Sequence, residues 1–192
     1  MKTIAWDIDD VLNDLLKIWF NKQWLTEHKE CNVIYEELKE NPPHRALGIS
    51  MTEYLDSLDN FRLKKYRDII FPVPDIMKWF LTYGHNYRHI ALTAVPLKAS
   101  HISSSWLFTH FGRWIRTFHF VPSKREGENL PVYDKNKGEY LNKIGNVDIF
   151  IDDSEENIKS AGKAGVKTLL IPRPWNSEKK SLREILYILS IL

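Results

Sequence analysis

Aspartates gather at two places in the sequence where an apolar run ends, and their type and spacing suit chemistry on a charged group. These acids follow the runs 3–6 and 147–151: Asp7, Asp9, Asp10, Asp152 and Asp153. Side chains alternate along a strand, so Asp7 and Asp9 begin on the same side. Carboxylates this close repel one another unless a cation lies between them. Because hard divalent cations prefer oxygen ligands, the sequence predicts a Mg²⁺ site where the two clusters meet.

Two further stretches have groups that suit a phosphate. The expected strand end Ala91–Ala94 offers the hydroxyl of Thr93 and free backbone N–H groups. The stretch 135–139 places Lys135 and Lys137 at the start of an expected helix. Acid pairs, a hydroxyl and a lysine are the groups that phosphoryl transfer uses. A metal and a lysine offset the phosphate charge, one carboxylate attacks, and another moves the proton.

The pattern after residue 74 predicts the framework that would bring these groups together. Continuous apolar strands are expected at 88–93, 114–121, 147–151 and 166–171, and helices at 75–83, 99–111, 138–144, 155–164 and 185–192. This alternation predicts an α/β fold with a Rossmann-like parallel sheet that helices cover on both faces. Ligands of such sheets bind beyond the carboxyl ends of the strands, where both acid clusters are expected.

The span between the first strand and the rest of the sheet is predicted to be helical. Apolar residues recur at helical spacing over 11–28, and Ser50 with Glu53 forms a capping-box pattern that begins a short helix through about Leu58. A further helix is expected over 61–70. We therefore expect a helical cap at 14–71, inserted after the first strand into an α/β core domain of residues 1–13 and 72–192.

Composition and charge narrow the class of protein. The chain has 192 residues, and its net charge of +2 argues neither for nor against a nucleic-acid partner. The basic residues form no long run, and we expect no nucleic-acid polymer as a partner. The single cysteine, Cys31, excludes an internal disulfide framework and suits a reducing compartment. The early acids are unlike a signal peptide, and the apolar stretch 185–192 is far shorter than a membrane span. We expect a cytoplasmic protein without a membrane partner, and the sequence does not indicate an oligomeric state.

Taken together, the four stretches resemble the haloacid dehalogenase superfamily of aspartate-nucleophile phosphatases, with its motifs in the same order over the core from Met1 to about Trp175. The matching residues, in motif order, are Asp7, Asp9, Val11 and Leu12, then Thr93, then Lys137 with Lys135 as the alternative, then Asp152 and Asp153. The Asp-Asp-Ser-x-x-Asn form of the last motif, the helical insert and Pro174–Asn176 are similar to the 5′-nucleotidase and 5′(3′)-deoxyribonucleotidase branch. Asp10 departs from that branch, which often has Gly at this position.

The resemblance implies a role for each acid. Asp7 would attack phosphorus and become an aspartyl phosphate. Asp9 would protonate the leaving alcohol and then deprotonate the attacking water. Mg²⁺ would be bound by the Asp7 carboxylate, the Asp9 backbone carbonyl and Asp153.

The same resemblance implies how the phosphate is held. Thr93 and the backbone N–H of Ala94 would bind phosphate oxygens, and Lys137 would offset the charge on the phosphate and the nucleophile. Asp152 and Asn157 would support these groups from behind.

The function implied is Mg²⁺-dependent hydrolysis of a small phosphate monoester, with a nucleoside monophosphate as the first choice of substrate. The alternatives are a sugar phosphate or another small metabolite, and a binding or regulatory protein that has the fold without turnover. Trp19 is a substrate-binding candidate that would stack a nucleobase, although aromatics at helical spacing more often form core. Lys124 and Arg125 would either reach the substrate or belong to a solvated loop.

Overall fold

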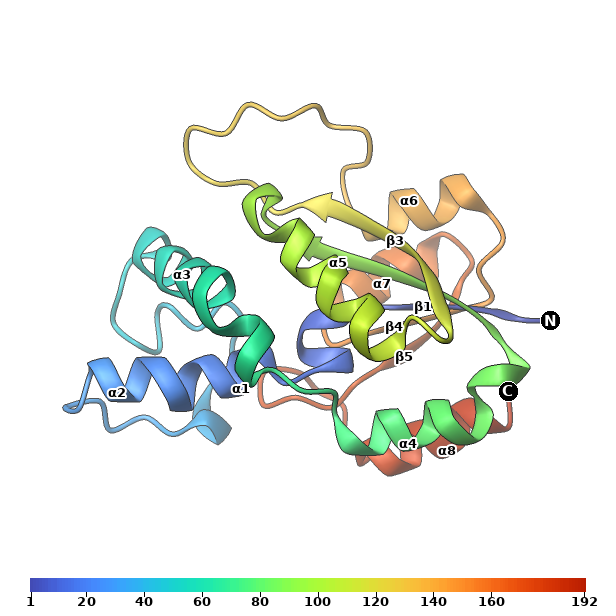
Figure 1. The fold of residues 1–192 in the computed structure, drawn as a ribbon, viewed down its shortest axis with the longest axis horizontal. Coiled ribbons are helices and arrows are strands. Elements are labelled where there is room, and N and C mark those ends of the chain that lie inside the picture. The colour runs from blue at the N-terminus through green and yellow to red at the C-terminus, as the bar shows by residue number, and fades with distance from the viewer.

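Five parallel strands form the centre of the computed structural model, which describes residues 1–192 (Figure 1). The strands are β1 (Thr3–Trp6), β2 (Arg88–Val95), β3 (Ile115–Pro122), β4 (Ile149–Asp152) and β5 (Lys167–Leu170). Their order across the sheet is β3-β2-β1-β4-β5. Because β1 pairs with both β2 and β4, the turn after β1 lies in the middle of the carboxyl edge. The predicted α/β fold with a Rossmann-like parallel sheet is confirmed.

Helices cover both faces of the sheet, and the alternation of β1 shows how. Ile4 and Trp6 point into one hydrophobic layer, and Ala5 points into another. The first layer includes side chains of α4 (Pro74–Tyr83), α5 (Leu97–Phe111) and α8 (Leu182–Ser190). The second layer includes α6 (Lys137–Ile144) and α7 (Glu155–Lys163). Strands buried on both faces are continuously apolar, which is the pattern in the sequence.

A helical segment fills the chain between β1 and α4. After a tight turn at Ile8–Leu12, it consists of α1 (Leu15–Trp19), a wider helical turn (Phe20–Trp24), α2 (Leu25–Glu27), a single 3₁₀ turn (Tyr35–Glu37) and α3 (Met51–Ile69). A second 3₁₀ turn, Gly84–Asn86, precedes β2. The Ser50 hydroxyl caps α3 by accepting from the Glu53 N–H at 3.1 Å, as predicted. The expected break between two short helices near residue 60 is wrong, because α3 is continuous. Asp59 can lie inside it since its carboxylate binds cations rather than competing for the backbone.

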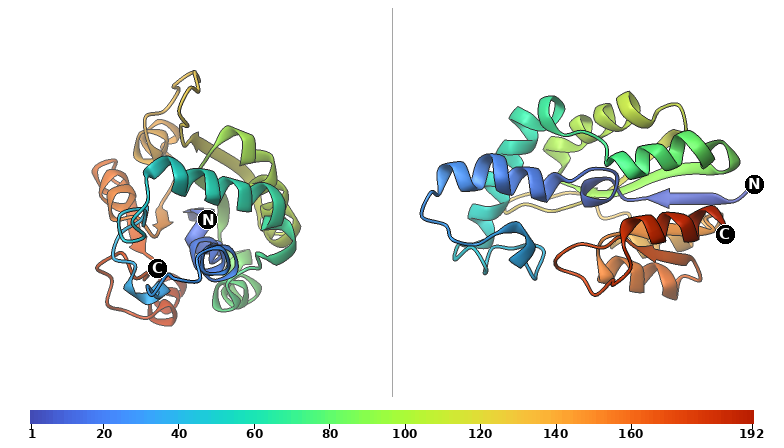
Figure 2. Two further views of the ribbon diagram at one scale, coloured as in Figure 1. Left: turned by 90° about the vertical axis from the view of Figure 1, so that its left-hand side faces the viewer. Right: turned by 90° about the horizontal axis from the view of Figure 1, so that it is seen from below.

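The helical segment stands over the carboxyl ends of the strands, while both chain termini lie at the opposite end of the molecule (Figures 1 and 2). The chain leaves the sheet and returns to it at adjacent points, since Asn13 and Pro72 form an antiparallel bridge and the Val73 N–H donates to the Leu12 carbonyl at 2.9 Å. Apolar side chains of the segment and of the sheet belong to one continuous core. The division into a core domain and a cap at 14–71 stays a prediction.

Several predicted boundaries change by a few residues. The strands β2 and β3 run on to Val95 and Pro122, and the last helix begins at Leu182 rather than at 185. Ser181 and Glu184 cap this helix reciprocally. None of the helices combines the length and the hydrophobicity that a membrane-spanning segment needs.

Candidate active site

A cavity of about 460 Å³ lies at the carboxyl edge of the sheet, between the turns after β1 and β4 and the helical segment. Most of the predicted site residues line it: Asp7, Asp9, Ala94, Lys137, Asp153 and Asn157. Asp152 is fully buried behind them. The topology therefore brings residues from four distant stretches to one place.

The turn after β1 presents the first acid cluster through an unusual backbone shape. Asp10 has φ 60° and ψ 13°, which is the left-handed region that glycine occupies without strain. Aspartate is among the few other residues that adopt it, because its short side chain bonds nearby backbone groups. Here the Asp10 carboxylate accepts from the Leu16 N–H at 2.9 Å and so helps to begin α1. The departure from glycine at this position is therefore compatible with the turn.

Lys137 joins the two acid clusters. Its Nζ atom lies 2.8 Å from Asp7 Oδ2 and 2.7 Å from Asp152 Oδ2, and its side chain is 2% exposed. Asn136 caps α6 by accepting from the Glu139 N–H, which places Lys137 at the first position of the helix. Lys135 contributes only its backbone N–H to Glu139, so Lys137 is the lysine that reaches the acids.

Glycine at position 138 permits this approach. A Cβ there would overlap the Ser160 hydroxyl and lie 2.7 Å from the Ser160 carbonyl carbon, so α6 and α7 could not pack as they do. The Lys-Gly pair thus combines the cation with the close helix contact that positions it.

Asp152 is held by donors on both oxygens. Besides Lys137, the Ser154 N–H donates to its Oδ1 at 2.8 Å, and Asn157 Nδ2 lies 3.1 Å from each oxygen. These bonds leave little of the Asp152 carboxylate for a ligand and fix it as the anchor of Lys137. The supporting role of Asp152 and Asn157 in the active site stays a prediction.

Asp153 faces the cavity and is held by the segment after β5. Trp175 Nε1 donates to Asp153 Oδ2 at 2.8 Å, and Asn176 Nδ2 donates to the Asp153 carbonyl at 2.8 Å. Arg173 in the same segment donates to the Asp10 carbonyl at 2.7 Å and to Asp14 at 2.6 Å. Sequence reasoning noted Trp175 and Asn176 only for their resemblance and missed Arg173, since nothing local marks a contact with the β1 turn.

The acids at the cavity floor carry more negative charge than their surroundings balance. Ligand oxygens of Asp7, Asp152 and Asp153 lie within 4.8 Å of one another, and Lys137 is the only cation that bonds to them. Burial raises the pKa of Asp7 to about 7, against the opposing pull of Lys137. Burial raises the pKa of Asp153 well above its usual range, and the negative charge of Asp152 raises it further.

A divalent cation fits this donor set. Burial disfavours the charged forms of the Asp7 and Asp153 carboxylates. A cation bound between them would stabilise those charged forms. The donor set consists of oxygen atoms, which are the ligands that Mg²⁺ prefers. Lys137 stays charged beside them: burial disfavours its ammonium, but Asp152 and Asp7 outweigh that effect and raise its pKa.

The Asp9 carboxylate binds partners other than the Lys137 ammonium that binds Asp7. Its Oδ2 accepts from Arg62 Nη2 at 2.8 Å, and its Oδ1 accepts from Tyr66 Oη at 2.6 Å and from Asn13 Nδ2 at 3.2 Å. Arg62 and Tyr66 belong to α3, so the helical segment binds the second acid of the first motif directly. Sequence reasoning missed these three partners. The only signal was polar residues on one face of a helical pattern, Asp59, Arg62 and Tyr66.

Three of the substrate-binding candidates have different outcomes. Ala94 lines the cavity, whereas Thr93 is 1% exposed beside it and does not. Trp19 is fully buried: it packs edge-on against Tyr54 and donates to Ser57 Oγ at 3.2 Å. The expectation that Trp19 contacts a substrate is therefore wrong in this structure, because the ring belongs to the core of the helical segment. The cavity wall is made instead by Leu15, Leu16, Met51, Tyr54, Leu55 and Leu58.

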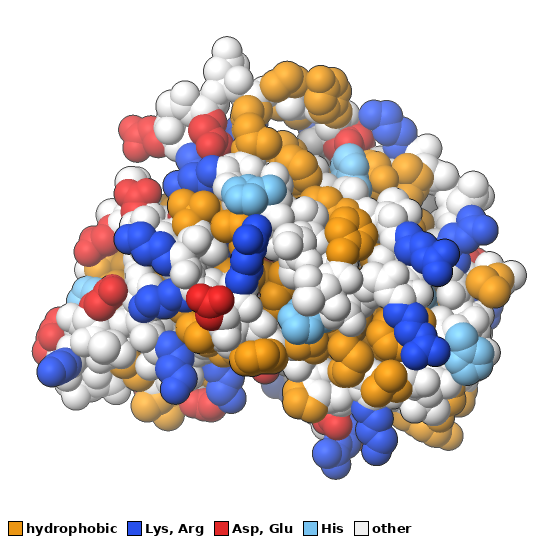
Figure 3. Space-filling view, in the orientation of Figure 1, with side chains coloured by type: hydrophobic (Ala, Val, Ile, Leu, Met, Phe, Trp, Pro, Cys, Tyr) orange, Lys and Arg blue, Asp and Glu red, His pale blue; other side chains and the backbone are white.

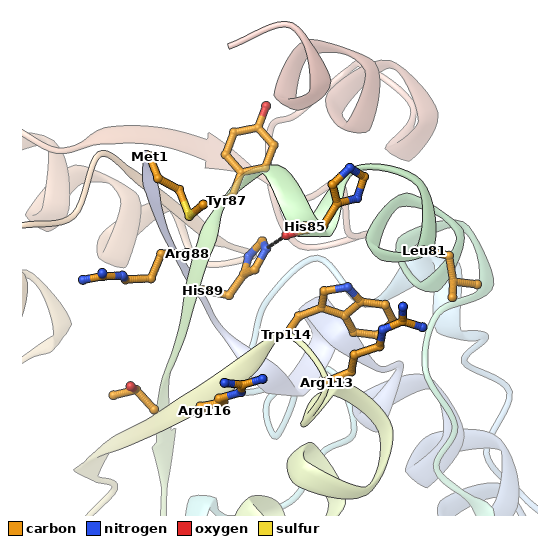
Figure 4. A pocket seen from close by; sticks show the side chains of 11 residues that line it. Met1, Leu81, His85, Tyr87, Arg88, His89, Arg113, Trp114 and Arg116 are labelled. Atoms are coloured by element: carbon orange, nitrogen blue, oxygen red, sulfur yellow. Dashed lines mark hydrogen bonds between the residues drawn. The ribbon is translucent and has the colours of Figure 1, made fainter.

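A larger cavity, of about 710 Å³, opens at the opposite, amino-terminal edge of the sheet (Figure 4). Arg88, Arg113 and Arg116 surround it, no carboxylate lines it, and Lys and Arg prevail at that end of the surface (Figure 3). Its one buried titratable group, His89, accepts from Trp6 Nε1 and donates to the Gly84 carbonyl, so both ring nitrogens are occupied. Burial lowers the pKa of His89 to about 4, which keeps the ring neutral. The cluster of acids that could hold a metal lies in the other cavity, not in this one.

Comparison with solved structures identifies the fold. A haloacid dehalogenase-like hydrolase from Streptococcus pneumoniae superposes with a TM-score of 0.64 at 16% identity, over 96% of this chain and 90% of that one. A protein described as a predicted phosphoglycolate phosphatase from Haemophilus somnus gives 0.60 at 15% identity, over 98% of each chain. A subfamily IA hydrolase of the superfamily from Geobacter sulfurreducens gives 0.55 at 14% identity, over 98% and 96%.

These likenesses show that the chain has the fold of the haloacid dehalogenase superfamily, with helices inserted after the first strand. No protein-family model matches the sequence, and no curated protein is similar enough to be matched with it. The structures named above are hydrolases, and none of the three is described as a nucleotidase.

Proposed function

We propose that this protein is a Mg²⁺-dependent phosphatase that hydrolyses a small phosphate monoester through an aspartyl phosphate on Asp7. The observation that carries the proposal is the convergence of Asp7, Lys137 and Asp153 on the floor of one cavity. A binding protein would not need a carboxylate nucleophile beside a buried lysine and a second acid, so we prefer an enzyme to a regulatory protein with the same fold.

Two steps account for the chemistry. In the first, an Asp7 oxygen forms a bond to phosphorus while the bond from phosphorus to the ester oxygen breaks, and Asp9 gives that oxygen a proton. In the second, a water oxygen attacks phosphorus, Asp9 takes the water proton, and the Asp7–phosphorus bond breaks to release inorganic phosphate. Lys137 offsets charge on the phosphate and on Asp7 in both steps.

Asp7, Asp153 and the backbone carbonyl of Asp9 would hold Mg²⁺, as the excess of buried carboxylates at the cavity floor supports. When bound, the ion draws negative charge from the phosphate oxygens and keeps the acids ionised. The backbone N–H of Ala94 and the hydroxyl of Thr93 remain our candidates for the phosphate oxygens.

For the alcohol part of the substrate, a nucleoside monophosphate remains the first choice. The observation that favours a nucleotide is the apolar wall that α1 and α3 give the cavity, which would contact a base rather than a small polar group. Its residues include Leu15, Leu16, Leu55 and Leu58. A sugar phosphate or another small metabolite is the second candidate. Lys124 at the rim would suit a second polar or acidic group, and one structural neighbour is described as a predicted phosphoglycolate phosphatase.

A phosphatase assay tests the proposal. With 4-nitrophenyl phosphate and Mg²⁺ we expect release of phosphate that stops in excess EDTA and returns when Mg²⁺ is restored. Asp7→Asn should abolish turnover, and Lys135→Met should keep it, since the Lys135 side chain does not bond to the acids. A panel of nucleoside monophosphates, sugar phosphates and phosphoglycolate then ranks the substrate classes. Turnover that is unchanged in EDTA or in Asp7→Asn would contradict the proposal.

A further inference from the structure

We propose that Arg62 and Tyr66 of α3 are positioning residues for Asp9: together they fix the orientation in which its carboxylate exchanges protons. The inference rests on the proposed function, because it concerns the acid–base role of Asp9. It adds that the helical segment takes part in the proton transfer by holding the group that performs it.

Both oxygens of the Asp9 carboxylate are bound from the helical segment. Arg62 Nη2 donates to Oδ2 at 2.8 Å, and Tyr66 Oη donates to Oδ1 at 2.6 Å. The three side chains are buried, and Asp9 and Arg62 both line the cavity. With one oxygen on each donor, the carboxylate cannot rotate without breaking a charge-assisted bond, which is among the stronger hydrogen bonds in proteins.

Arg62 is itself held in place by a chain of alternating charges. Asp59, one turn earlier on α3, lies 3.5 Å from Arg62 Nη1. Arg125 then binds Asp59 with two donors, at 2.7 Å and 2.9 Å, and Lys98 adds a third contact at 3.2 Å. Arg125 is therefore not part of a solvated loop. It ties the loop after β3 to α3 and so fixes the base from which Arg62 reaches Asp9.

Tyr66 is fixed from two sides. Asn13 Nδ2 donates to the Tyr66 hydroxyl at 2.7 Å as well as to Asp9, and the side-chain Oδ1 of Asn13 accepts from the Asp10 and Leu15 N–H groups. Trp106 of α5 lies edge-on to the Tyr66 ring at 5.9 Å. The phenol therefore has one place to donate its proton, and that place is Asp9.

A purely structural reading of these contacts makes a different prediction. Buried ion pairs contribute little net stability compared with well-packed apolar residues. If Arg62 and Tyr66 only attached α3 to the sheet, their loss would affect all substrates alike. If they position Asp9, their loss should matter where the leaving group needs a proton and much less where it does not.

Two esters of similar size separate these readings: 4-nitrophenyl phosphate, whose leaving group departs without a proton, and benzyl phosphate, whose alcohol needs one. The parameter is kcat/KM, which reports the steps up to formation of the phosphoenzyme and is insensitive to its hydrolysis. Tyr66→Phe and Arg62→Gln should each lower kcat/KM for benzyl phosphate by roughly 10–100-fold, within the range of general acid catalysis. The same variants should change kcat/KM for 4-nitrophenyl phosphate by less than about 3-fold.

Controls make the outcome decisive. Arg67→Gln alters an exposed arginine of the same helix and should leave both substrates unchanged. Asp9→Asn should show the larger, leaving-group-dependent loss, and adding Tyr66→Phe to it should cost nothing further, because a positioning residue acts only through the group that it holds. Arg62→Lys should recover part of the activity on benzyl phosphate. Tyr66→Phe removes a single oxygen, so it carries the test if Arg62→Gln does not fold.

Equal losses on both esters, or further loss when Tyr66→Phe is added to Asp9→Asn, would overturn the inference and leave the proposed function intact. If Asp9→Asn itself shows no dependence on the leaving group, the acid–base role of Asp9 fails instead. A wild-type protein that hydrolyses neither ester overturns both.

Discussion

The ammonium of Lys137 lies 2.8 Å from the carboxylate of Asp7, and the two residues come from the start of α6 and the end of β1. Neither residue could stay buried and charged alone, since an isolated ion in a protein interior is costly. The pair therefore links the stability of the site to its chemistry.

Replacing Lys137 by Met should affect both properties. Loss of the cation leaves Asp7 and Asp152 without their shared partner, and breaking a buried ion pair by removing one side costs about 3–5 kcal/mol. We expect a lower free energy of unfolding in urea and a loss of kcat of at least about 100-fold. Lys135→Met is the matched control, and a comparable loss in that variant would mean that Lys137 is not the lysine of the site.

Gly138→Ala should damage the site from a distance. The added methyl group meets Ser160 of α7, so α6 must shift and carry Lys137 away from Asp7. Overpacking of this kind costs about 1–3 kcal/mol, and kcat should fall as well. Gly162→Ala on α7 is the control, because a Cβ there meets nothing within 4 Å. If both variants behave alike, the close contact does not position the lysine.

Stabilisation by Mg²⁺ should increase with pH. Burial raises the pKa values of Asp7 and of Asp10 to about 7, so the metal-free folded state binds more protons than the unfolded chain between about pH 4 and pH 7. The stability that these groups contribute is full below about pH 4 and is lost as pH rises through about 7. Mg²⁺ needs Asp7 and Asp153 in their ionised forms and should therefore restore, at the alkaline end, the stability that is lost through Asp7.

Thermal unfolding measures this effect. At saturating Mg²⁺ we expect an increase in Tm of about 5 °C at pH 8 and close to none at pH 5. Asp153→Asn should remove the increase at every pH. An increase that is independent of pH, or one that persists in Asp153→Asn, would show that the ion binds elsewhere.

Much of the fold could be predicted because its determinants are local. Ile4, Ala5 and Trp6 are all apolar, which indicates a strand that is covered on both faces. The acids mark the ends of β1 and β4, and recognising them does not require knowing which strands pair. Asn136 fixes the start of α6 through a short-range bond to the Glu139 N–H. The preference for Lys137 over Lys135 also depended on where this helix begins. The resemblance kept Lys135 as the alternative.

The contacts of Asp9 could not be predicted in the same way. Arg62 and Tyr66 are ordinary helix residues in the sequence, and they meet Asp9 only because α3 folds back over the β1 turn. Trp19 shows the opposite difficulty. Aromatic residues at helical spacing face either a core or a cavity, and only the packing of Tyr54 and Ser57 against this ring decides for the core.

The central claim is that the phosphoryl group is transferred to Asp7, and trapping the intermediate tests it most directly. The protein is mixed with radiolabelled 4-nitrophenyl phosphate and Mg²⁺, quenched in acid within milliseconds, and digested so that the label can be assigned to a peptide. We predict label on the peptide that contains Asp7, more of it in Asp9→Asn, where the water attack lacks its base, and none in Asp7→Asn. Label on another residue, or unchanged labelling in Asp7→Asn, would contradict the account.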